Sequence, residues 1–448
     1  MAQILSQSCI SPKTESDETC LKRYTLYNAS LTSRTLNRIA EPLLYRTINL
    51  QHHKLDRLIL LLQCLVLQPK LGLHVRELRT GDLDRLEEII YSDYWAPFIA
   101  ELRNIVRRSP FHFVLRQNTC EGLGGELSYP YVTALLILCK NLVRWSFILR
   151  ELEEDEHDEL CGEQACGQAW EAQLEGRLSP GFPLHQLREV VVDESTYELT
   201  DLGQLYWRFA LPSLRSLKAY RMRIDEDTWF GSSKTYAEQA AVSTFKMSPQ
   251  ELDVLSRRRL ISNVRHLDLP YMEISVAGLQ RLFDLCPSLE SLKILWADYG
   301  DEAYHFIDMH YPEGPELDFP GIGNVLRTRG RSLRVLHLHI EDFSPPSYID
   351  LKWQDFDMLP PLGSLVELES LEELSVDKVM LTGQDGSPVT GRELQRILPR
   401  SLTSLEVTDY SNTVDEAFCA ELEALRADEG REKLRTVCIS KGPTDPAE

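Results

Sequence analysis

Two histidines form the clearest pattern of side chains that could do chemistry. His337 and His339 flank Leu338 in the segment LHLHI, so in an extended strand both imidazoles point to one face and the leucines to the other. Two imidazoles placed in this way could bind a transition metal, but the sequence offers no evident third ligand. We therefore interpret the pair as part of a solvated strand face and expect no metal.

Two further groups suggest sites, but their spacing argues against them. His157, Cys161 and Cys166 form HxxxCxxxxC in an acidic stretch, without the close cysteine pair that is typical of zinc sites. The glycine-rich segment 120–130, CEGLGGELSYP, has neither spacing of a phosphate-binding loop, and its glutamates would repel an anion. A surface loop with incidental thiols and a turn are the expected structures.

No nucleophile with an evident partner emerges from the chain. It contains no GxSxG motif, and its ten cysteines and eleven histidines include no nucleophile beside an evident catalytic partner. We therefore predict no catalytic residue, no cofactor and no enzymatic activity. A hydrolase hidden around 298–319 stays open, and a cluster of buried, convergent polar side chains would be needed to support it.

Composition narrows the possible partners and compartment. The 448 residues carry 48 basic and 69 acidic side chains, and the net charge of −21 disfavours nucleic acid and anionic membrane surfaces. The start lacks a secretory signal and the cysteines are scattered, which indicates free thiols in the cytoplasm or nucleus. The longest apolar stretch, 55–67, is too short to span a bilayer and predicts a buried helix.

Internal repetition is the most informative feature of the sequence. Five copies of the pattern LxxLxL follow a serine, and these serines are Ser213, Ser288, Ser332, Ser370 and Ser401. Four looser copies begin at Leu142, Leu187, Val264 and Leu434. The shortest steps between first apolar positions, 264 to 289 and 187 to 214, fit the 20–29 residues of a leucine-rich repeat.

Helical periodicity precedes several of these copies. The segments 276–287 and 391–399 have apolar residues at helical spacing and end in Pro287 and Pro399, which cannot continue a helix. Strand and helix therefore alternate. We predict an α/β fold: a leucine-rich-repeat-like curved solenoid with parallel strands on the inside and helices on the outside.

The expected domain boundaries follow the repeats. They are an amino-terminal segment 1–50 that is partly disordered at 1–20, irregular or helical first repeats at 51–140, the solenoid at 141–440 with insertions at 151–180, 225–248, 298–319 and 341–361, and a disordered tail at 441–448.

Residues that flank the buried aliphatics of each strand should lie together on the concave face. The predicted partner-binding residues are Lys218, Tyr220, Asp268, Lys293, Leu295, Trp296, His337, His339, Asp377 and Glu406. Tyr220 and Trp296 are the candidate anchors, because aromatic residues are enriched among the residues that dominate binding energy. An ordinary solvated face is the alternative.

The amino-terminal segment has its own pattern. Leu31, Leu36, Ile39 and Leu43 fall near helical spacing, and Pro42 is expected to interrupt the helix. The run LTSRTLNRIAEPLLYRTINL resembles the second half of the F-box of fungal F-box proteins. Residues 47–50 could form a first strand.

The resemblance implies a small helical module that docks on a Skp-type adaptor of a cullin ubiquitin ligase, while the repeats hold a protein substrate. The implied adaptor-binding residues are Leu31, Leu36, Ile39, Pro42, Leu43, Leu44 and Tyr45. The first half departs from the family, because 10–25 reads ISPKTESDETCLKRYT where a Leu-Pro and an aliphatic helix are expected. The F-box is then degenerate, or the start of the gene model is truncated, or adaptor binding has been lost.

Two functions follow from these patterns. The leading hypothesis is a non-enzymatic, intracellular adaptor that recruits a protein substrate to a ubiquitin ligase. The alternative is a repeat scaffold without a ligase role, in which the amino-terminal helix caps the solenoid. Capping and docking are compatible with each other.

Overall fold

The computed structural model describes thirteen stretches of the chain, in two compact units. The described residues are 17–50, 55–80, 96–108, 134–148, 184–193, 200–201, 209, 211–224, 261–296, 318–340, 360–383, 393–409 and 416–441. The first unit comprises residues 1–196 and 210–215, and the second comprises residues 197–209 and 216–448. Each unit is presented by itself.

The first unit is built on a ladder of parallel strands. The strands are β1 (Thr47–Asn49), β2 (Glu77–Arg79), β3 (Arg144–Ile148) and β4 (Glu189–Asp193), paired in this order. Its helices are α2 (Asp17–Thr32), α3 (Arg34–Leu44), α4 (Leu55–Leu67), α5 (Pro69–Gly72) and α7 (Ala96–Arg107). The predicted helix at 55–67 is confirmed, since α4 buries Leu58, Ile59, Leu62 and Leu65.

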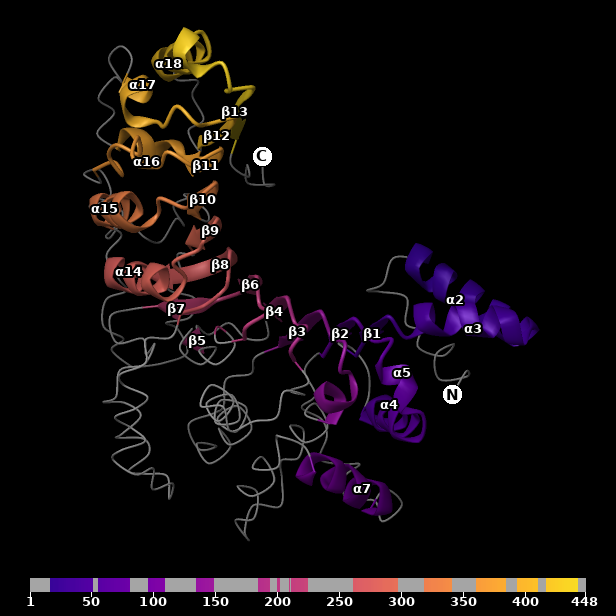
Figure 1. Ribbon diagram of the computed structural model, residues 1–448. Helices are drawn as coiled ribbons and strands as arrows, with labels where there is room; N and C mark the ends of the chain where they lie inside the picture. The colour runs from indigo at the N-terminus through magenta and orange to yellow at the C-terminus, as the bar shows by residue number, and fades with distance from the viewer. Residues whose placement is uncertain are drawn as a thin grey trace, which may run out of the picture. The chain divides into compact units, whose positions relative to one another are not determined.

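The second unit continues the same alternation of strand and helix over a longer ladder (Figure 1). Its strands are β5 (Thr200–Asp201), β6 (Ser216–Ala219), β7 (Met222–Ile224), β8 (His266–Ile274), β9 (Ser291–Trp296), β10 (Val335–Ile340), β11 (Glu373–Asp377), β12 (Ser404–Asp409) and β13 (Thr436–Lys441). Every pairing in this unit is parallel, and the ladder does not close on itself. Its helical elements are α14 (Val276–Leu285), α15 (Phe319–Arg329), α16 (Lys378–Thr382), α17 (Glu393–Ile397), α18 (Glu416–Arg426) and a short 3₁₀ turn at Glu429–Arg431.

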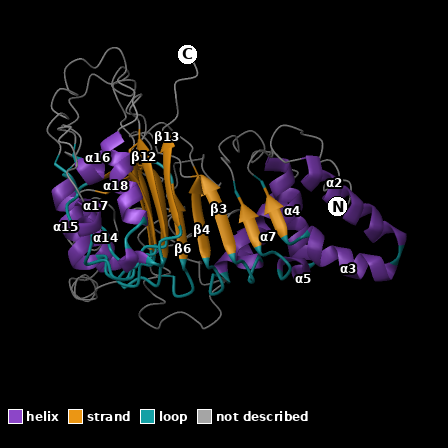
Figure 2. Ribbon diagram, turned by 90° about the horizontal axis from the view of Figure 1, so that it is seen from above, coloured by secondary structure: helices purple, strands orange, loops and turns teal. Residues whose placement is uncertain are grey.

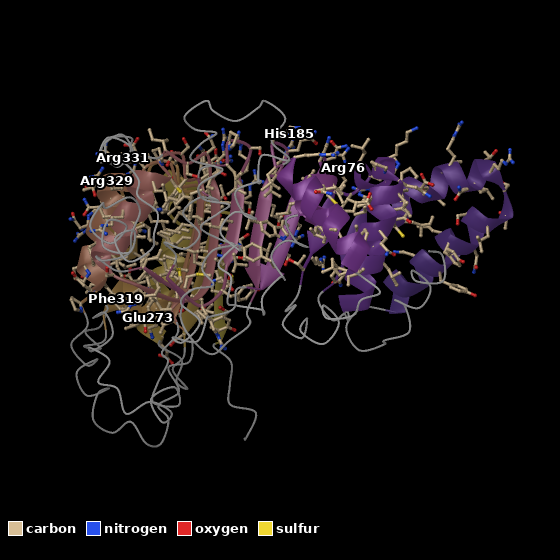
Figure 3. The ribbon with its side chains drawn as sticks, turned by 90° about the horizontal axis from the view of Figure 1, so that it is seen from below. Arg76, His185, Glu273, Phe319, Arg329 and Arg331 are labelled. Carbon is tan, nitrogen blue, oxygen red and sulfur yellow. The ribbon has the colours of Figure 1, made fainter. Side chains whose placement is uncertain are left out.

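The helices of the second unit lie on one face of its sheet (Figure 2). In Figure 3, Glu273 near the end of β8 and Phe319 at the start of α15 lie on one side of the unit. Arg329 at the end of α15 lies on the opposite side, so α15 carries the chain back across the sheet. Arg329 also contacts Asp284 of α14 at 2.7 Å, which joins neighbouring helices. The predicted α/β alternation is thus confirmed.

Rows of aliphatic side chains run across the strands on the helix-covered face. One row, aligned by the pairing register, consists of Leu217, Leu267, Leu292, Leu336, Leu374, Leu405 and Val437. All of these except Val437 are buried. Burying each leucine contributes about 2 kcal/mol, so the row provides much of the driving force for stacking the repeats.

The serine that precedes the repeat pattern has a structural role in three of the repeats. The hydroxyls of Ser213, Ser332 and Ser401 each donate, at 2.7 Å, to the carbonyl of the first apolar residue of the preceding repeat. For Ser332 this acceptor is the carbonyl of the buried Leu289. The bond satisfies a carbonyl at the turn into the strand and ties consecutive repeats together.

The prolines at the ends of the two helical segments behave as predicted. α14 ends at Leu285, two residues before Pro287, and α17 ends at Ile397, two residues before Pro399. Phe319, which the sequence placed in an insertion, is instead the first residue of α15 and is fully buried. The other insertion residues, apart from 318, 360 and 361, lie outside the described residues.

The expected break at Pro42 is wrong. α3 extends to Leu44 and contains Pro42 in its last turn, where the missing N–H removes one hydrogen bond near an end that follows two residues later. The break falls instead at Ser33, whose hydroxyl accepts from the N–H of Leu36 at 3.1 Å and begins α3.

None of the helices in the described stretches has the length and hydropathy needed to cross a membrane.

Replacement of Ser332 by alanine tests the serine bond between repeats. We expect Ser332→Ala to lower the free energy of unfolding by about 1 to 2 kcal/mol, because the Leu289 carbonyl loses its donor inside the protein. Urea unfolding followed by circular dichroism measures the change. Ser288→Ala is the control, since Ser288 is exposed and bonds to no described residue. Equal effects of the two substitutions would contradict this account.

Candidate functional site

The solvent-facing side of the second unit's sheet carries aligned rows of polar side chains. The pairing register places one residue from each of seven strands in what we term the central row: Lys218, Asp268, Lys293, His337, Ser375, Glu406 and Cys438. Their strand neighbours are mostly buried on the opposite face. Period-two alternation therefore turns the central row away from the core, as the sequence predicts.

Most of the predicted partner-binding residues are brought together on this face. Five of them stand in the central row: Lys218, Asp268, Lys293, His337 and Glu406. Two residues further along their strands, Leu295, His339 and Asp377 also project to this side. These eight residues therefore project to one side of the sheet, as the strand alternation predicts, and their binding of a partner stays a prediction.

A pair of tyrosines lies near one end of the central row. Tyr220 follows β6 and stacks on Tyr271 of β8, with ring centroids 6.4 Å apart. The ammonium of Lys218 lies 4.8 Å from the Tyr220 ring centroid and 3.0 Å from Asp268 Oδ2. This combination of aromatic rings and a cation is typical of protein-recognition surfaces.

Backbone geometry explains how Tyr271 reaches this place. Tyr271 has a φ of +59° and sits at a bulge between Pro270 and Met272, where the pairing of β8 with β9 shifts register. Arg221 also has a positive φ, +51°, and its N–H donates to the Pro270 carbonyl at 3.1 Å. Left-handed backbone at non-glycine residues is uncommon and often accompanies function, so the bulge marks this end of the face.

Hydrogen bonds join the two histidines to neighbouring strands. His337 Nε2 lies 2.7 Å from Glu373 Oε1, and His339 Nδ1 lies 2.9 Å from Asp377 Oδ1. His339 Nε2 lies 3.0 Å from Ser375 Oγ, so both nitrogens of this ring have partners. The pair belongs to a hydrogen-bonded network across β10 and β11, and no three-ligand metal group occurs among the residues described.

Burial shifts two pKa values in this network. Burial lowers the pKa of His337 below its ordinary 6.5, with Lys293 and His339 acting in the same direction and Glu373 opposing them. Burial also raises the pKa of Asp377 above 3.8, although bonds from His339 and from the Ile340 N–H favour its ionised form. Burial of the charged form therefore outweighs the favourable contacts at both residues.

Asp377, His339 and Ser375 form a chain of hydrogen bonds in the order found in serine hydrolases. The surroundings do not fit that chemistry. Ser375 is only 4% exposed, its hydroxyl also lies 3.2 Å from Glu406 Oε2, and it sits mid-strand between two paired neighbours. Backbone N–H groups there serve strand pairing and are not available to stabilise an oxyanion.

Trp296 does not belong to the recognition face. Its side chain is 3% exposed, and it is the last residue of β9, aligned with the buried Ile340 on the helix-covered side. The prediction of Trp296 as an anchor is therefore wrong, because period-two alternation turns it inward with Leu292 and Ile294. Asp377 reaches the face but is fully buried beneath His339, so it positions this ring instead of meeting a partner.

Sequence reasoning missed Tyr271, Glu373 and Ser375. Glu373 and Ser375 lie four and two residues before Asp377 on β11, so the three side chains point to the same side of the strand. The alternation that predicted Asp377 on this face therefore also predicts the other two. Tyr271 could not be found in this way, because the bulge reverses the alternation locally.

The predicted adaptor-binding residues divide between two helices. Leu31 lies on α2, and Leu36, Ile39, Pro42, Leu43 and Leu44 lie on α3. α2 and α3 contact each other, and Tyr24 of α2 is also exposed. The exposed fractions are 63% for Leu31, 43% for Leu36, 59% for Ile39 and 47% for Leu43.

Three of these side chains make a continuous stripe. Leu36, Ile39 and Leu43 follow the spacing of one helical face, and we term them the α3 stripe. Tyr45 does not contribute to it: Tyr45 is 5% exposed and follows α3, and burial raises its pKa to about 12. The prediction that Tyr45 contacts an adaptor is therefore wrong, and its ring supports the core instead.

The remaining candidates for chemistry are thiols and loops. Burial raises the pKa of Cys139 and Cys286 to about 12, so both stay neutral thiols near pH 7 and are poor nucleophiles. His157, Cys161, Cys166 and the glycine segment 120–130 lie outside the described residues.

Two comparisons with known proteins found no match. No protein-family model matches it, and no curated protein is similar to it at a significant level. The class established by the fold is thus an α/β protein with parallel ladders backed by helices.

Stability should fall in mildly acidic solution because of His337. The folded state holds this imidazole neutral at pH values where the unfolded chain protonates it, so the folded state binds fewer protons. We expect the free energy of unfolding to decrease as the pH falls below about 6.5. His337→Gln should weaken this dependence. Urea titrations at several pH values measure it, and an identical pH profile in both proteins would contradict the prediction.

Ser375 should be unreactive despite its neighbours. We expect a fluorophosphonate probe to leave it unlabelled in the intact chain, because it is buried and lacks an oxyanion site. Mass spectrometry of the treated protein measures the labelling. Adduct formation that disappears in Ser375→Ala would show that the relay is active.

Proposed function

We propose that this protein is a non-enzymatic interaction adaptor, an F-box-type subunit that recruits a protein substrate to a Skp/cullin ubiquitin ligase. The α2–α3 pair would hold the adaptor, and the second unit's polar face would hold the substrate. In this proposal the parallel ladders are the leucine-rich-repeat-like body of an F-box protein. The observation that carries it is the exposed α3 stripe.

The α3 stripe supports docking over capping alone. A terminal cap on a repeat array needs a polar outer face to stay soluble. Here Leu36, Ile39 and Leu43 instead present apolar surface to solvent, with Leu31 exposed on the adjoining helix. Apolar residues at helical spacing are the anchors by which a helix binds a partner's groove.

The polar face of the second unit's sheet supports the proposal that this unit binds the substrate. Its side chains combine tyrosines, histidines and charges of both signs on a rigid sheet. Rigid placement reduces the entropy lost on binding. Binding the two partners at once would raise the effective concentration of substrate lysines near the transferring enzyme, so no catalytic group is required of this chain.

The scaffold without a ligase role is the second candidate. Ala40 and Tyr45 are buried, so α3 and the turn after it also cover apolar residues of the first unit. That packing is what a cap alone would do. The two candidate functions therefore differ in the exposed face of α3, which binds an adaptor in the first and binds no partner in the second.

Charge placed on the α3 stripe tests the adaptor link. We expect Ile39→Asp and Leu43→Asp each to weaken binding to a purified Skp-type adaptor by at least about tenfold, because an exposed apolar anchor is replaced by a carboxylate. Their free energies of unfolding should change by only about 0.5 kcal/mol, since both side chains are exposed. Calorimetric titration measures binding.

Ile261→Asp is the matched control, because Ile261 is 65% exposed and belongs to the second unit. It should bind the adaptor as the unchanged protein does. Adaptor binding that is absent in the unchanged protein, or equal in all variants, would refute the ligase link and favour the scaffold.

A further inference from the structure

Two charges of the central row have no oppositely charged partner among the described residues. Lys218 pairs with Asp268 at 3.0 Å, whereas His337, whose lowered pKa keeps it neutral near pH 7, is hydrogen-bonded to Glu373 at 2.7 Å and adds no charge to the row. Lys293 lies between these pairs and makes no ion pair or hydrogen bond with any described residue. The residue is partly exposed, so a partner can reach it.

Glu406 is the corresponding acidic residue. Its Oε2 is bonded by the Ser375 hydroxyl at 3.2 Å, and it has no basic partner within the described stretches. The hydroxyl holds the carboxylate in place without neutralising it. Within the described part of the chain, the central row therefore presents one unpaired positive and one unpaired negative charge, and both side chains project from the sheet on the same side.

The register fixes how far apart these charges are. Lys293 is on β9 and Glu406 on β12, with His337 of β10 and Ser375 of β11 between them. Neighbouring strands lie about 4.8 Å apart, so three steps separate the two backbone positions by about 14 Å. An extended peptide that crosses the strands rises about 3.4 Å per residue and covers this distance in four residues.

Even spacing matters as much as length. In an extended peptide, residues i and i+4 project to the same side, whereas residues i and i+3 project to opposite sides. We propose that the central row binds an extended peptide segment with an acidic residue at position i and a basic residue at position i+4, in either chain direction. The acidic side chain meets Lys293 and the basic side chain meets Glu406.

This inference deepens the proposed function, since it names the substrate class for the polar face and rests on that face being used for recognition. It does not depend on the adaptor. A nucleic acid is disfavoured, because the row offers one cation without a partner among the described residues, in a chain of net charge −21. Complementarity of both signs instead favours a segment that carries both signs.

Fluorescence anisotropy with a set of labelled nonapeptides tests the proposal on the full chain. The reference peptide has glutamate at its third position, lysine at its seventh, and serine, alanine or threonine elsewhere. We expect it to bind at least about fivefold more tightly than a peptide whose lysine is moved to the sixth position. Binding should weaken as salt rises.

Charge exchange supplies the sharper result. Glu406→Lys should lose at least about fivefold in affinity for the reference peptide and prefer a peptide with glutamate at both positions. Lys293→Glu should prefer a peptide with lysine at both positions. Lys70→Glu and Glu393→Lys are matched controls, because both residues are exposed and lie outside the central row. They should bind the reference peptide unchanged.

The proposal is overturned if the reference peptide does not bind, if both spacings bind equally, or if charge exchange does not change the preference. All four variants leave the α3 stripe intact, so they should still bind the adaptor. If the peptides fail to bind while the protein still binds the adaptor, only this inference is refuted. If the protein does not bind the adaptor but keeps the peptide preference, only the ligase link is refuted.

Discussion

The parallel pairing of strands whose every second side chain is buried is the constraint on which the rest of the structure depends. Leu292, Leu336 and Leu374 align across β9, β10 and β11 and are fully buried. A shift of one residue in any strand would bring its polar side chains into the core at a cost of several kcal/mol. The same constraint places Lys293, His337 and Ser375 in one row on the opposite face.

The two candidate surfaces differ in how their side chains relate to the burial of the core. On the second unit's face, polar residues occupy the positions that burial leaves free, and hydrogen bonds such as that of His339 with Asp377 fix their orientation. On α3, apolar residues occupy positions that burial does not use. Leu36, Ile39 and Leu43 therefore have no role in the described fold that polar residues could not fill, which is the physical reason to seek a partner for them.

Much of the fold follows from local pattern, and the exceptions have identifiable causes. The Leu-x-Leu alternation predicted β9 to β12 because each strand repeats one environment. Pro42 was misjudged because a proline in the last turn removes only one bond. The burial of Trp296 and the bulge at Tyr271 depend on neighbouring strands, and so does the His339–Ser375 bond. Single-strand patterns do not contain that information.

Cross-linking of engineered cysteines tests the ladder most directly. Lys293 and His337 are register partners on adjacent strands, about 4.8 Å apart at their α-carbons, whereas Lys293 and Ser375 are two strands apart. The account predicts that Lys293→Cys with His337→Cys forms a disulfide on mild oxidation, mapped by mass spectrometry of the digested protein. Lys293→Cys with Ser375→Cys should not, because α-carbons more than about 7 Å apart are not bridged. A disulfide in the second pair and none in the first would contradict the register from which the polar face follows.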